Sequence, residues 1–274
     1  LIKILKNKRR VDEGVVEKII KRDKEFFVGT FSKKNNTSFV IPIDKNIKTD
    51  FYIPSGDCLN AKNNDRVLVK ILEWPERAKC PFGKITEIIG ESGNFSTEIL
   101  SIIKKHGIET EFSKESLKYV KGLNEKIIKK DIENRRDFRE EACFTIDPDD
   151  AKDFDDAVSV KKINTNTFEI GVHIADVSHY VKPNTALDKD AIKRGCSVYL
   201  ADRVIPMLPE KLANKLCSLR PNEEKLCFST VFIMNTNGEI ISDWLGKTII
   251  KSKKRFTYNE AQNVINNKQG EFFE

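Results

Sequence analysis

The segment Phe144–Val160, "FTIDPDDAKDFDDAVSV", places six aspartates in ten consecutive positions between two apolar runs. Carboxylates this close together raise one another's pKa unless a positive charge lies among them. Lys152 is the only cation within the run. The sequence therefore predicts that either water screens the carboxylates or a metal ion occupies the space among them.

A hard cation that takes oxygen ligands suits such a segment, and magnesium with a partial carboxylate shell keeps positions for water and phosphate. The ion can polarise a phosphoryl oxygen and activate a water molecule. A second ion about 4 Å away can stabilise both the attacking and the leaving oxygen. This is the chemistry of phosphodiester cleavage.

Two other interpretations of the segment compete with this one. A calcium-binding EF-hand loop does not fit, because counting from Asp147 the sixth position is Lys152 rather than glycine and the twelfth is Val158 rather than glutamate. An acidic, solvated turn without a metal stays open, because aspartate also favours turns.

The positive charge of the chain is concentrated at its start. The formal net charge is +6, and residues 1–34 hold eleven Lys or Arg against five Asp or Glu, so the whole excess lies there. Such a segment suits a polyanion such as nucleic acid, and membrane headgroups would serve equally on charge alone. A lysine-rich solvated surface is the simpler alternative.

The composition is that of a globular protein of one large or two smaller domains, with 274 residues, 39% hydrophobic and 33% charged. There is no apolar run of about 18 residues and no secretory pattern, so we expect a cytoplasmic protein without a membrane partner. The six cysteines form no C-x-x-C pair and no zinc-ligand cluster, and we expect reduced thiols.

From Val11 to about Gly90, six short β-type runs alternate with turn signals, beginning with "GVVEKII". This pattern predicts a small, OB-type all-β barrel. Lysines and aromatic rings are mixed in it, as on surfaces that stack bases. Six aromatic residues lie in these runs: Phe26, Phe27, Phe31, Phe39, Phe51 and Tyr52. Because alternate strand residues face inward, we expect two or three of these six rings to reach a ligand.

The next zone has helical periodicity and predicts a helical connector over residues 93–142. Ser96 and Ser113 are candidate N-caps. A helix is expected to continue over residues 125–142, with the cluster Arg135–Arg139 at its solvated end. From Cys143 onward strands and helices mix, with helices expected at "DKDAIKRG", "PEKLANKL" and "YNEAQNVI".

The order of residues in the aspartate segment closely resembles the catalytic signature of the RNB family, the ribonuclease II and ribonuclease R exoribonucleases. The spacing D-x5-D-x-D-D is specific, and it is met here by Asp147, Asp153, Asp155 and Asp156. The resemblance continues through "GVHIADVSHYV", "RGCSVYLADRVIPMLPEKLANKLCSLRPNE" and "KRFTYNEA". Ribonuclease R is the more similar of the two because its cold-shock module resembles the front zone.

The resemblance implies a multidomain fold. Residues 1–8 would end a preceding cold-shock module, and residues 9–92 would form a cold-shock, OB-type RNA-binding barrel. Residues 93–142 would be the helical connector. Residues 143–274 would form the N-terminal part of a mixed α/β RNB catalytic domain.

The resemblance also implies the site and its activity. Asp147, Asp153 and Asp156 would hold Mg²⁺, and Asp155 would be the carboxylate whose loss abolishes cleavage but spares RNA binding. Tyr199 would clamp the 3′-terminal nucleotides and Tyr258 would contact a base further back. The activity would be processive 3′-to-5′ hydrolysis of single-stranded RNA to nucleoside 5′-monophosphates by a monomer, with structured and ribosome-associated RNA as further partners.

Other polar residues carry expectations that come from the residues themselves. We expect Lys33 and Lys34 in the basic front zone to contact RNA phosphates. His173, Asp176 and His179 invite a metal interpretation, but His173 and Asp176 would point to opposite faces of a strand. Structural roles are therefore predicted for both histidines.

The chain also departs from the family pattern. RNB relatives carry more catalytic-domain sequence after the position of Glu274 and then an S1 RNA-binding domain, and "LIKIL" resembles the last strand of another barrel. We therefore expect a fragment of a larger enzyme or a truncated gene product. The alternative function is that of an RNA-binding fragment or degenerate paralogue without nuclease activity.

Overall fold

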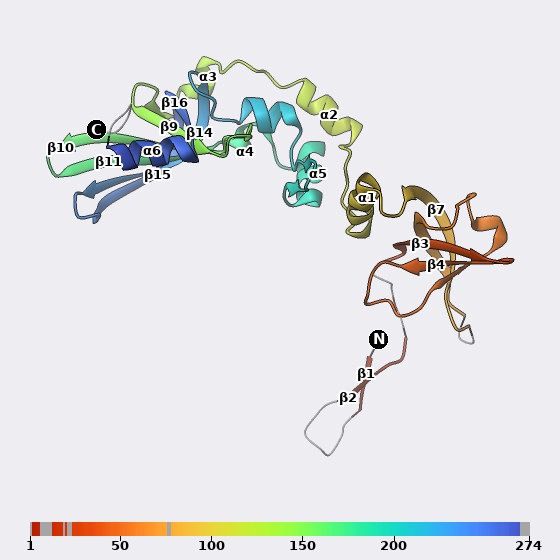
Figure 1. Cartoon of the computed structure of the whole chain (residues 1–274). Coiled ribbons are helices and arrows are strands. Elements are labelled where there is room, and N and C mark those ends of the chain that lie inside the picture. The colour runs from red at the N-terminus through yellow and green to blue at the C-terminus, as the bar shows by residue number, and fades with distance from the viewer. Residues whose placement is uncertain (1, 6–12, 19, 21–23, 76–77, 269–274) are drawn as a thin grey trace. The chain divides into compact units, whose positions relative to one another are not determined.

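The computed structural model describes residues 2–5, 13–18, 20, 24–75 and 78–268 (Figure 1). Contacts within the chain define two units, Leu1–Glu109 and Thr110–Glu274. The predicted boundary between residues 8 and 9 lies outside the described residues. Each unit is described below by itself.

Five strands of the first unit close into a barrel in the order β3-β4-β5-β7-β6. They are β3 (Phe26–Lys34), β4 (Thr37–Pro42), β5 (Phe51–Ile53), β6 (Asp65–Glu73) and β7 (Phe82–Glu91), with a 3-10 turn, η1 (Ser55–Asp57), after β5. Alternate side chains point inward and form one core: Phe31, Val40, Phe51, Ile53, Val67, Val69 and Ile85. The predicted small β barrel is confirmed.

The aromatic residues of the barrel divide between its core and its surface. Phe31 and Phe51 are buried in the core, whereas Phe26 is 47% exposed. Phe39 and Tyr52 are half-buried and contact each other edge to face, with ring centroids 5.8 Å apart. Phe27 is also half-buried but packs against the core, so Phe26, Phe39 and Tyr52 are the rings that stay at least partly open, and their contact with a ligand stays a prediction.

The run "GVVEKII", one of the six runs from which a barrel was predicted, is not part of the five-stranded barrel. Its described part begins in β2 (Glu13–Val16), which pairs with β1 (Ile2–Leu5) in a separate two-stranded sheet. The barrel has no edge free for another strand, because β3 pairs with β6 and closes it.

Helix α1 (Phe95–Lys105) packs on the barrel and buries Ile99 and Ile103. Its N-cap is Asn94 rather than the predicted Ser96. The Asn94 side chain accepts hydrogen bonds from the amides of Ser96 and Thr97, which places the cap two residues earlier. The other predicted cap, Ser113, is confirmed at the start of α2.

A seven-stranded sheet forms the frame of the second unit, in the order β16-β9-β10-β11-β14-β15-β8. The inner strands pair antiparallel, and the edge strands β16 and β8 pair parallel to β9 and β15. The strands are β8 (Arg136–Phe138), β9 (Ala142–Asp147), β10 (Asp156–Asn164), β11 (Thr167–Ala175), β14 (Glu224–Asn235), β15 (Ile240–Lys251) and β16 (Lys254–Thr257). The aspartate segment joins β9 to β10.

The helical segments of this unit are α2 (Lys114–Lys121), α3 (Lys129–Ile132), α4 (Val177–Tyr180), α5 (Ala186–Arg194), a π-helical segment η2 (Lys211–Leu216) and α6 (Tyr258–Asn267). A small two-stranded sheet, β12 (Val198–Tyr199) and β13 (Val204–Ile205), follows α5. The three helices predicted after Cys143 are thus present. The predicted helix over residues 125–142 was wrong, because only α3 forms there and β8 then pairs with β15, a tertiary contact that outweighs local periodicity.

One face of the sheet carries the core of the second unit. Small and polar residues of β10, β11 and β14 alternate inward there, among them Ala157, Ala175 and Cys227. They pack against residues from helices and loops, including Leu187, Leu212 and Leu219, each 0% exposed. The aspartate segment therefore starts and ends on strands fixed by a packed core.

His173 lies inside this core within a chain of hydroxyl groups. Its Nδ1 is 2.7 Å from Ser229 Oγ, and its Nε2 is 2.8 Å from Ser159 Oγ. Burial, together with the charge of Arg136, lowers its pKa to about 4, so the ring is neutral at pH 7. The predicted structural role of His173 is confirmed.

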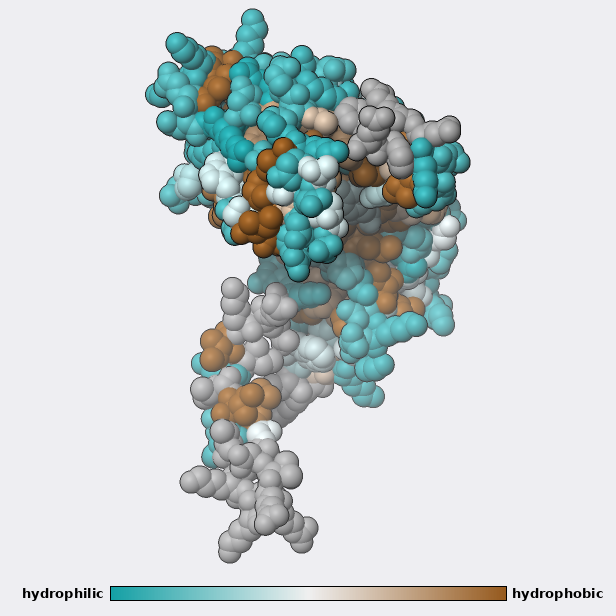
Figure 2. Space-filling view, turned by 90° about the vertical axis from the view of Figure 1, so that its left-hand side faces the viewer, coloured by the Kyte–Doolittle hydropathy of each residue, from teal (hydrophilic) through white to brown (hydrophobic). Residues whose placement is uncertain are grey.

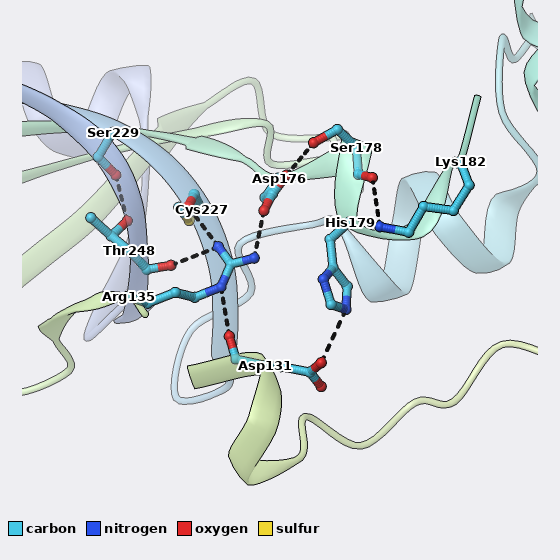
Figure 3. Close-up of polar contacts among 9 residues, drawn as sticks. All are labelled: Asp131, Arg135, Asp176, Ser178, His179, Lys182, Cys227, Ser229 and Thr248. Atoms are coloured by element: carbon cyan, nitrogen blue, oxygen red, sulfur yellow. Dashed lines mark hydrogen bonds and ion pairs between the residues drawn. The ribbon is translucent and has the colours of Figure 1, made fainter. Parts of the chain in front are cut away.

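A buried ion pair crosses the same region. Arg135 Nη2 lies 2.6 Å from Asp176 Oδ2, and the two side chains are 3% and 1% exposed (Figure 3). Arg135 also donates to the carbonyl oxygens of Asp131, Cys227 and Thr248. The prediction that Arg135 lies at a solvated helix end was wrong, because α3 ends at Ile132 and the chain then enters the sheet.

Asp176 also differs from expectation. Strand β11 ends at Ala175, and Asp176 is the residue before α4, so its side chain is not constrained to the face opposite His173. His179, within α4, packs edge to face on Tyr180 and lies 3.7 Å from a carboxylate oxygen of Asp131. These contacts agree with a structural role for His179.

Parts of the other sheet face are open to solvent. Ile174, Phe228 and Leu245, from β11, β14 and β15, are 42–61% exposed. Figure 2 shows hydrophobic areas separated by hydrophilic ones on one side of the molecule. No helix in the described part of the chain is long and apolar enough to cross a lipid bilayer.

Candidate active site

The six aspartates occupy the end of one strand, a loop and the start of the next strand. Asp147 is the last residue of β9 and Asp156 is the first of β10. Asp149 and Asp150 are exposed in a turn, where the amide of Ala151 donates to the carbonyl of Pro148. The prediction that these two are turn residues is confirmed.

Phe154 separates two of the predicted site residues and packs against the core of the unit. Side chains of neighbouring residues in an extended segment point in opposite directions. Asp153 and Asp155 flank the inward-facing Phe154, and they remain half-buried and exposed, respectively. The packing of Phe154 against the core thus fixes the part of the loop that carries both carboxylates.

The carboxylates are close enough to affect one another's ionisation. Desolvation is the main cause that raises the pKa of Asp155 above its ordinary value of 3.8, although the residue as a whole is exposed. The charges of three neighbours add to the rise: Asp153, Asp156 and Asp147. The structure therefore brings together all four aspartates of the predicted motif.

Asp147 is the most enclosed of the four, at 8% exposed. Burial raises its pKa, the Thr145 hydroxyl and the charge of Arg255 oppose the rise, and the charges of Asp156 and Asp153 add to it. Its Oδ2 atom is buried without a hydrogen-bond partner. A buried carboxylate oxygen without a partner is costly and suits a position that a cation completes.

Arg255 is a cation near this cluster that local sequence does not indicate. Strand β16 pairs parallel to β9 and places Arg255 opposite Thr145. Its Nη2 donates to the carbonyl of Pro148, and its guanidinium carbon lies 5.6 Å from the centre of the Phe154 ring. Lys152 is thus the only cation of the run itself but not the only one near the cluster. No signal within the segment could have identified Arg255.

The two predicted tyrosines are both on the surface. Tyr199, on β12, is 69% exposed, and its hydroxyl lies 3.5 Å from Asp153 Oδ2. The charge of Asp153 is the main cause that raises the pKa of Tyr199. Tyr258 is 61% exposed and directly follows Thr257, which pairs with Asp147 between β16 and β9. Folding thus brings both tyrosines towards the carboxylates from distant parts of the sequence.

The predicted lysines belong to the other unit. Lys33 and Lys34 end β3 and are exposed, and they pair with Ser38 and Thr37 of β4. The amide of Lys33 donates to Asn63 Oδ1, which fixes the backbone at this end of the barrel. Their ammonium groups are therefore available to an anionic ligand.

The donor set fits a hard cation, because the clustered groups are carboxylate oxygens and Asp147 Oδ2 lacks a partner. Among the residues that the structure describes, no three His, Cys, Asp or Glu side chains are spaced as a formed metal site. The carboxylates are thus gathered but not arranged as a coordination shell. Asp147, Asp153 and Asp156 lie near enough to act on one another's charge and are candidates to hold the ion.

Comparison with known families matches residues 135–272 to the RNB domain and residues 39–113 to a cold shock domain. The ribonuclease R of Thermotoga maritima is 39% identical over 259 residues, which cover 94% of this chain and 36% of that protein. The chain thus spans about a third of the length of such curated relatives.

Two solved structures are similar over most of the chain. The RNase R of Mycoplasma genitalium in complex with ribose methylated single-stranded RNA gives a TM-score of 0.88 at 25% identity, covering 99% of this chain and 44% of that chain. The same protein in complex with double-stranded RNA gives 0.84 at 26% identity, covering 94% and 46%. The similarity extends over both units.

Proposed function

Because this chain belongs to the RNB family, we propose that its carboxylate cluster carries the chemistry of a magnesium-dependent, processive 3′-to-5′ exoribonuclease that acts on single-stranded RNA. The products would be nucleoside 5′-monophosphates. The observation that carries this proposal is the gathering of Asp147, Asp153, Asp155 and Asp156 around one loop, with Asp147 Oδ2 buried and unpartnered.

Each residue of the site has a task in this reaction. Asp147, Asp153 and Asp156 would hold Mg²⁺, and the bound ion would supply polarisation of the phosphoryl oxygen and activation of water. Asp155, the fourth carboxylate of the cluster, would orient the attacking water and accept its proton while the bond from phosphorus to the leaving 3′ oxygen breaks. The charge of Arg255 opposes the rise in the pKa of Asp147 and so limits the repulsion among the carboxylates.

The tyrosines would position the RNA strand. The exposed ring of Tyr199 can stack on the 3′-terminal base while its hydroxyl lies beside Asp153. Tyr258 would contact a base further from the 3′ end. Single-stranded RNA with a free 3′ end is the proposed partner, and structured RNA is a second one because the Mycoplasma relative was solved with double-stranded RNA.

RNA binding without hydrolysis is the second candidate. It is favoured by the match of residues 39–113 to a cold shock domain and by the exposed Lys33 and Lys34 on the barrel. Both functions require RNA binding, so only turnover separates them.

The experiment that tests the proposal follows a 5′-labelled single-stranded RNA incubated with this chain in Mg²⁺ or in chelator. Exonuclease chemistry predicts stepwise shortening from the 3′ end that requires Mg²⁺. RNA that is bound but stays full length in Mg²⁺ would favour the binding function for this polypeptide. Shortening that continues in chelator would contradict the metal-dependent mechanism.

The barrel provides a separate prediction about affinity. Replacing both Lys33 and Lys34 with alanine should reduce the slope of log K against log salt concentration, by about 0.7 for each phosphate of a single strand that is no longer neutralised. The measurement is RNA binding by fluorescence anisotropy at several salt concentrations.

The matched control replaces Lys45 and Lys48 with alanine. Both lysines are exposed and lie between β4 and β5 of the same unit. An unchanged slope for the Lys33 and Lys34 variant, or equal changes for both pairs, would contradict a phosphate path along the end of β3.

A further inference from the structure

The backbone of the aspartate loop is held by one buried hydroxyl group. Ser218 Oγ donates to the carbonyl of Lys152 at 2.9 Å and accepts from the amide of Phe154 at 3.1 Å. Ser218 is 0% exposed. Its side chain therefore bridges the peptide groups on both sides of Asp153.

Two further hydrogen bonds fix the neighbouring backbone. The amide of Leu219 donates to the carbonyl of Phe154 at 2.8 Å, and the amide of Ala175 donates to the carbonyl of Asp155 at 3.0 Å. These two contacts use main-chain donors, which a side-chain substitution leaves in place. Ser218 is thus the side chain that ties Asp153 to the core.

The position of Asp153 matters because the other carboxylates are anchored differently. Asp147 is fixed at the end of β9 and Asp156 at the start of β10, whereas Asp153 lies in the loop. Loss of the Ser218 hydroxyl would leave the Lys152 carbonyl and the Phe154 amide without this partner. Buried peptide groups without partners are costly, so the loop would shift to find new ones.

We propose that Ser218 is a positioning residue that sets the place of Asp153 relative to Asp147 and thereby the affinity of the carboxylates for a divalent cation. This inference rests on the proposed magnesium-dependent function. Groups that orient metal-binding side chains without touching the ion typically change metal affinity 10–100-fold when removed. The hydroxyl acts here through the backbone.

The first test is titration of this chain with Mg²⁺ alone by isothermal calorimetry. Ser218→Ala should bind Mg²⁺ roughly ten-fold or more weakly than the wild type. Ser218→Cys keeps a weak donor and a similar size, so its affinity should lie between the two. This second variant keeps the test open if Ser218→Ala does not fold.

Ser229→Ala is the matched control. Ser229 is also a buried serine, 1% exposed, and its hydroxyl contacts His173 and Thr248 rather than the loop. It should therefore lower stability but leave Mg²⁺ affinity close to that of the wild type. Equal losses of affinity in Ser218→Ala and Ser229→Ala would overturn the proposal.

The second test is hydrogen–deuterium exchange of peptides covering residues 147–156, measured without metal. Ser218→Ala should speed exchange there, and Ser229→Ala should not. If Ser218→Ala shows faster exchange in the loop but binds Mg²⁺ as tightly as the wild type, the positioning role of Ser218 is overturned and the proposed function is not affected. A wild-type chain that binds no Mg²⁺ would overturn the metal site of the proposed function, and this inference with it.

Discussion

If the proposed exonuclease function holds, the Asp155→Asn variant should lose magnesium-dependent RNA shortening by roughly 10²–10⁴-fold, the range expected when a positioned proton acceptor is removed. Its affinity for RNA should stay within a few-fold of that of the wild type. The reason is that the amide keeps the size of the carboxylate but cannot accept a proton in the transition state. The measurement pairs initial rates of shortening with an RNA binding isotherm for each protein.

Asp150→Asn is the control for this prediction, because it makes the same change of charge in the exposed turn of the same loop. Its rate should stay near that of the wild type. Equal rate losses in both variants would indicate a general effect of charge. A large loss of RNA affinity in Asp155→Asn would show that Asp155 contributes to binding rather than to the chemical step.

The second large effect concerns stability. Arg135→Met should lower the free energy of unfolding by about 3–5 kcal/mol, because it leaves Asp176 as a buried charge without its partner. The measurement is urea unfolding at pH 7, followed by circular dichroism.

Arg136→Met is the matched neighbour. Arg136 pairs with Glu169 at 2.7 Å, but its side chain is 40% exposed, so the loss should be at most about 1 kcal/mol. The double variant Arg135→Met with Asp176→Leu should recover most of the lost stability, because no buried charge remains. Similar losses in the two single arginine variants would contradict the importance of the buried pair.

The dependence on pH gives an independent check. Burial alone would raise the pKa of Asp176, but hydrogen bonds from Ser178 and Arg135, with the charges of Arg135 and Lys247, outweigh it and lower the pKa below 3.8. The stabilisation is therefore complete above the unfolded pKa and is lost as pH falls through the lower, folded pKa. In Arg135→Met the pKa of the Asp176 carboxyl should rise. The difference in free energy of unfolding between this variant and the wild type should therefore become smaller as the pH is lowered.

The sequence by itself determined the family and the local elements of the fold. The spacing of Asp147, Asp153, Asp155 and Asp156 predicted the RNB resemblance, and the family comparison confirms it. The alternation of short apolar runs predicted the barrel, because strand periodicity is a local property. Both signals lie within a few residues of one another along the chain.

The helical periodicity of residues 125–142 gave a wrong prediction because periodicity is a local property. A pattern of charged and apolar residues reports which side of a helix could be buried, but not whether another strand competes for the segment. There β15 takes Arg136–Phe138 as a parallel partner, and the buried contacts of Arg135 accompany that pairing. Tertiary pairing outweighed the local preference.

Only the tertiary structure decided how distant residues contact the carboxylates of the candidate site. Arg255 approaches Asp147 through the pairing of β16 with β9, Tyr199 reaches Asp153 across 46 positions, and Ser218 bridges the loop from 64 positions beyond Phe154. No local pattern marks such contacts, because each depends on strand register and on core packing. The sequence, through the family resemblance, thus supplied the carboxylates and the tyrosines, and the fold supplied the charge of Arg255 and the hydroxyl of Ser218 around them.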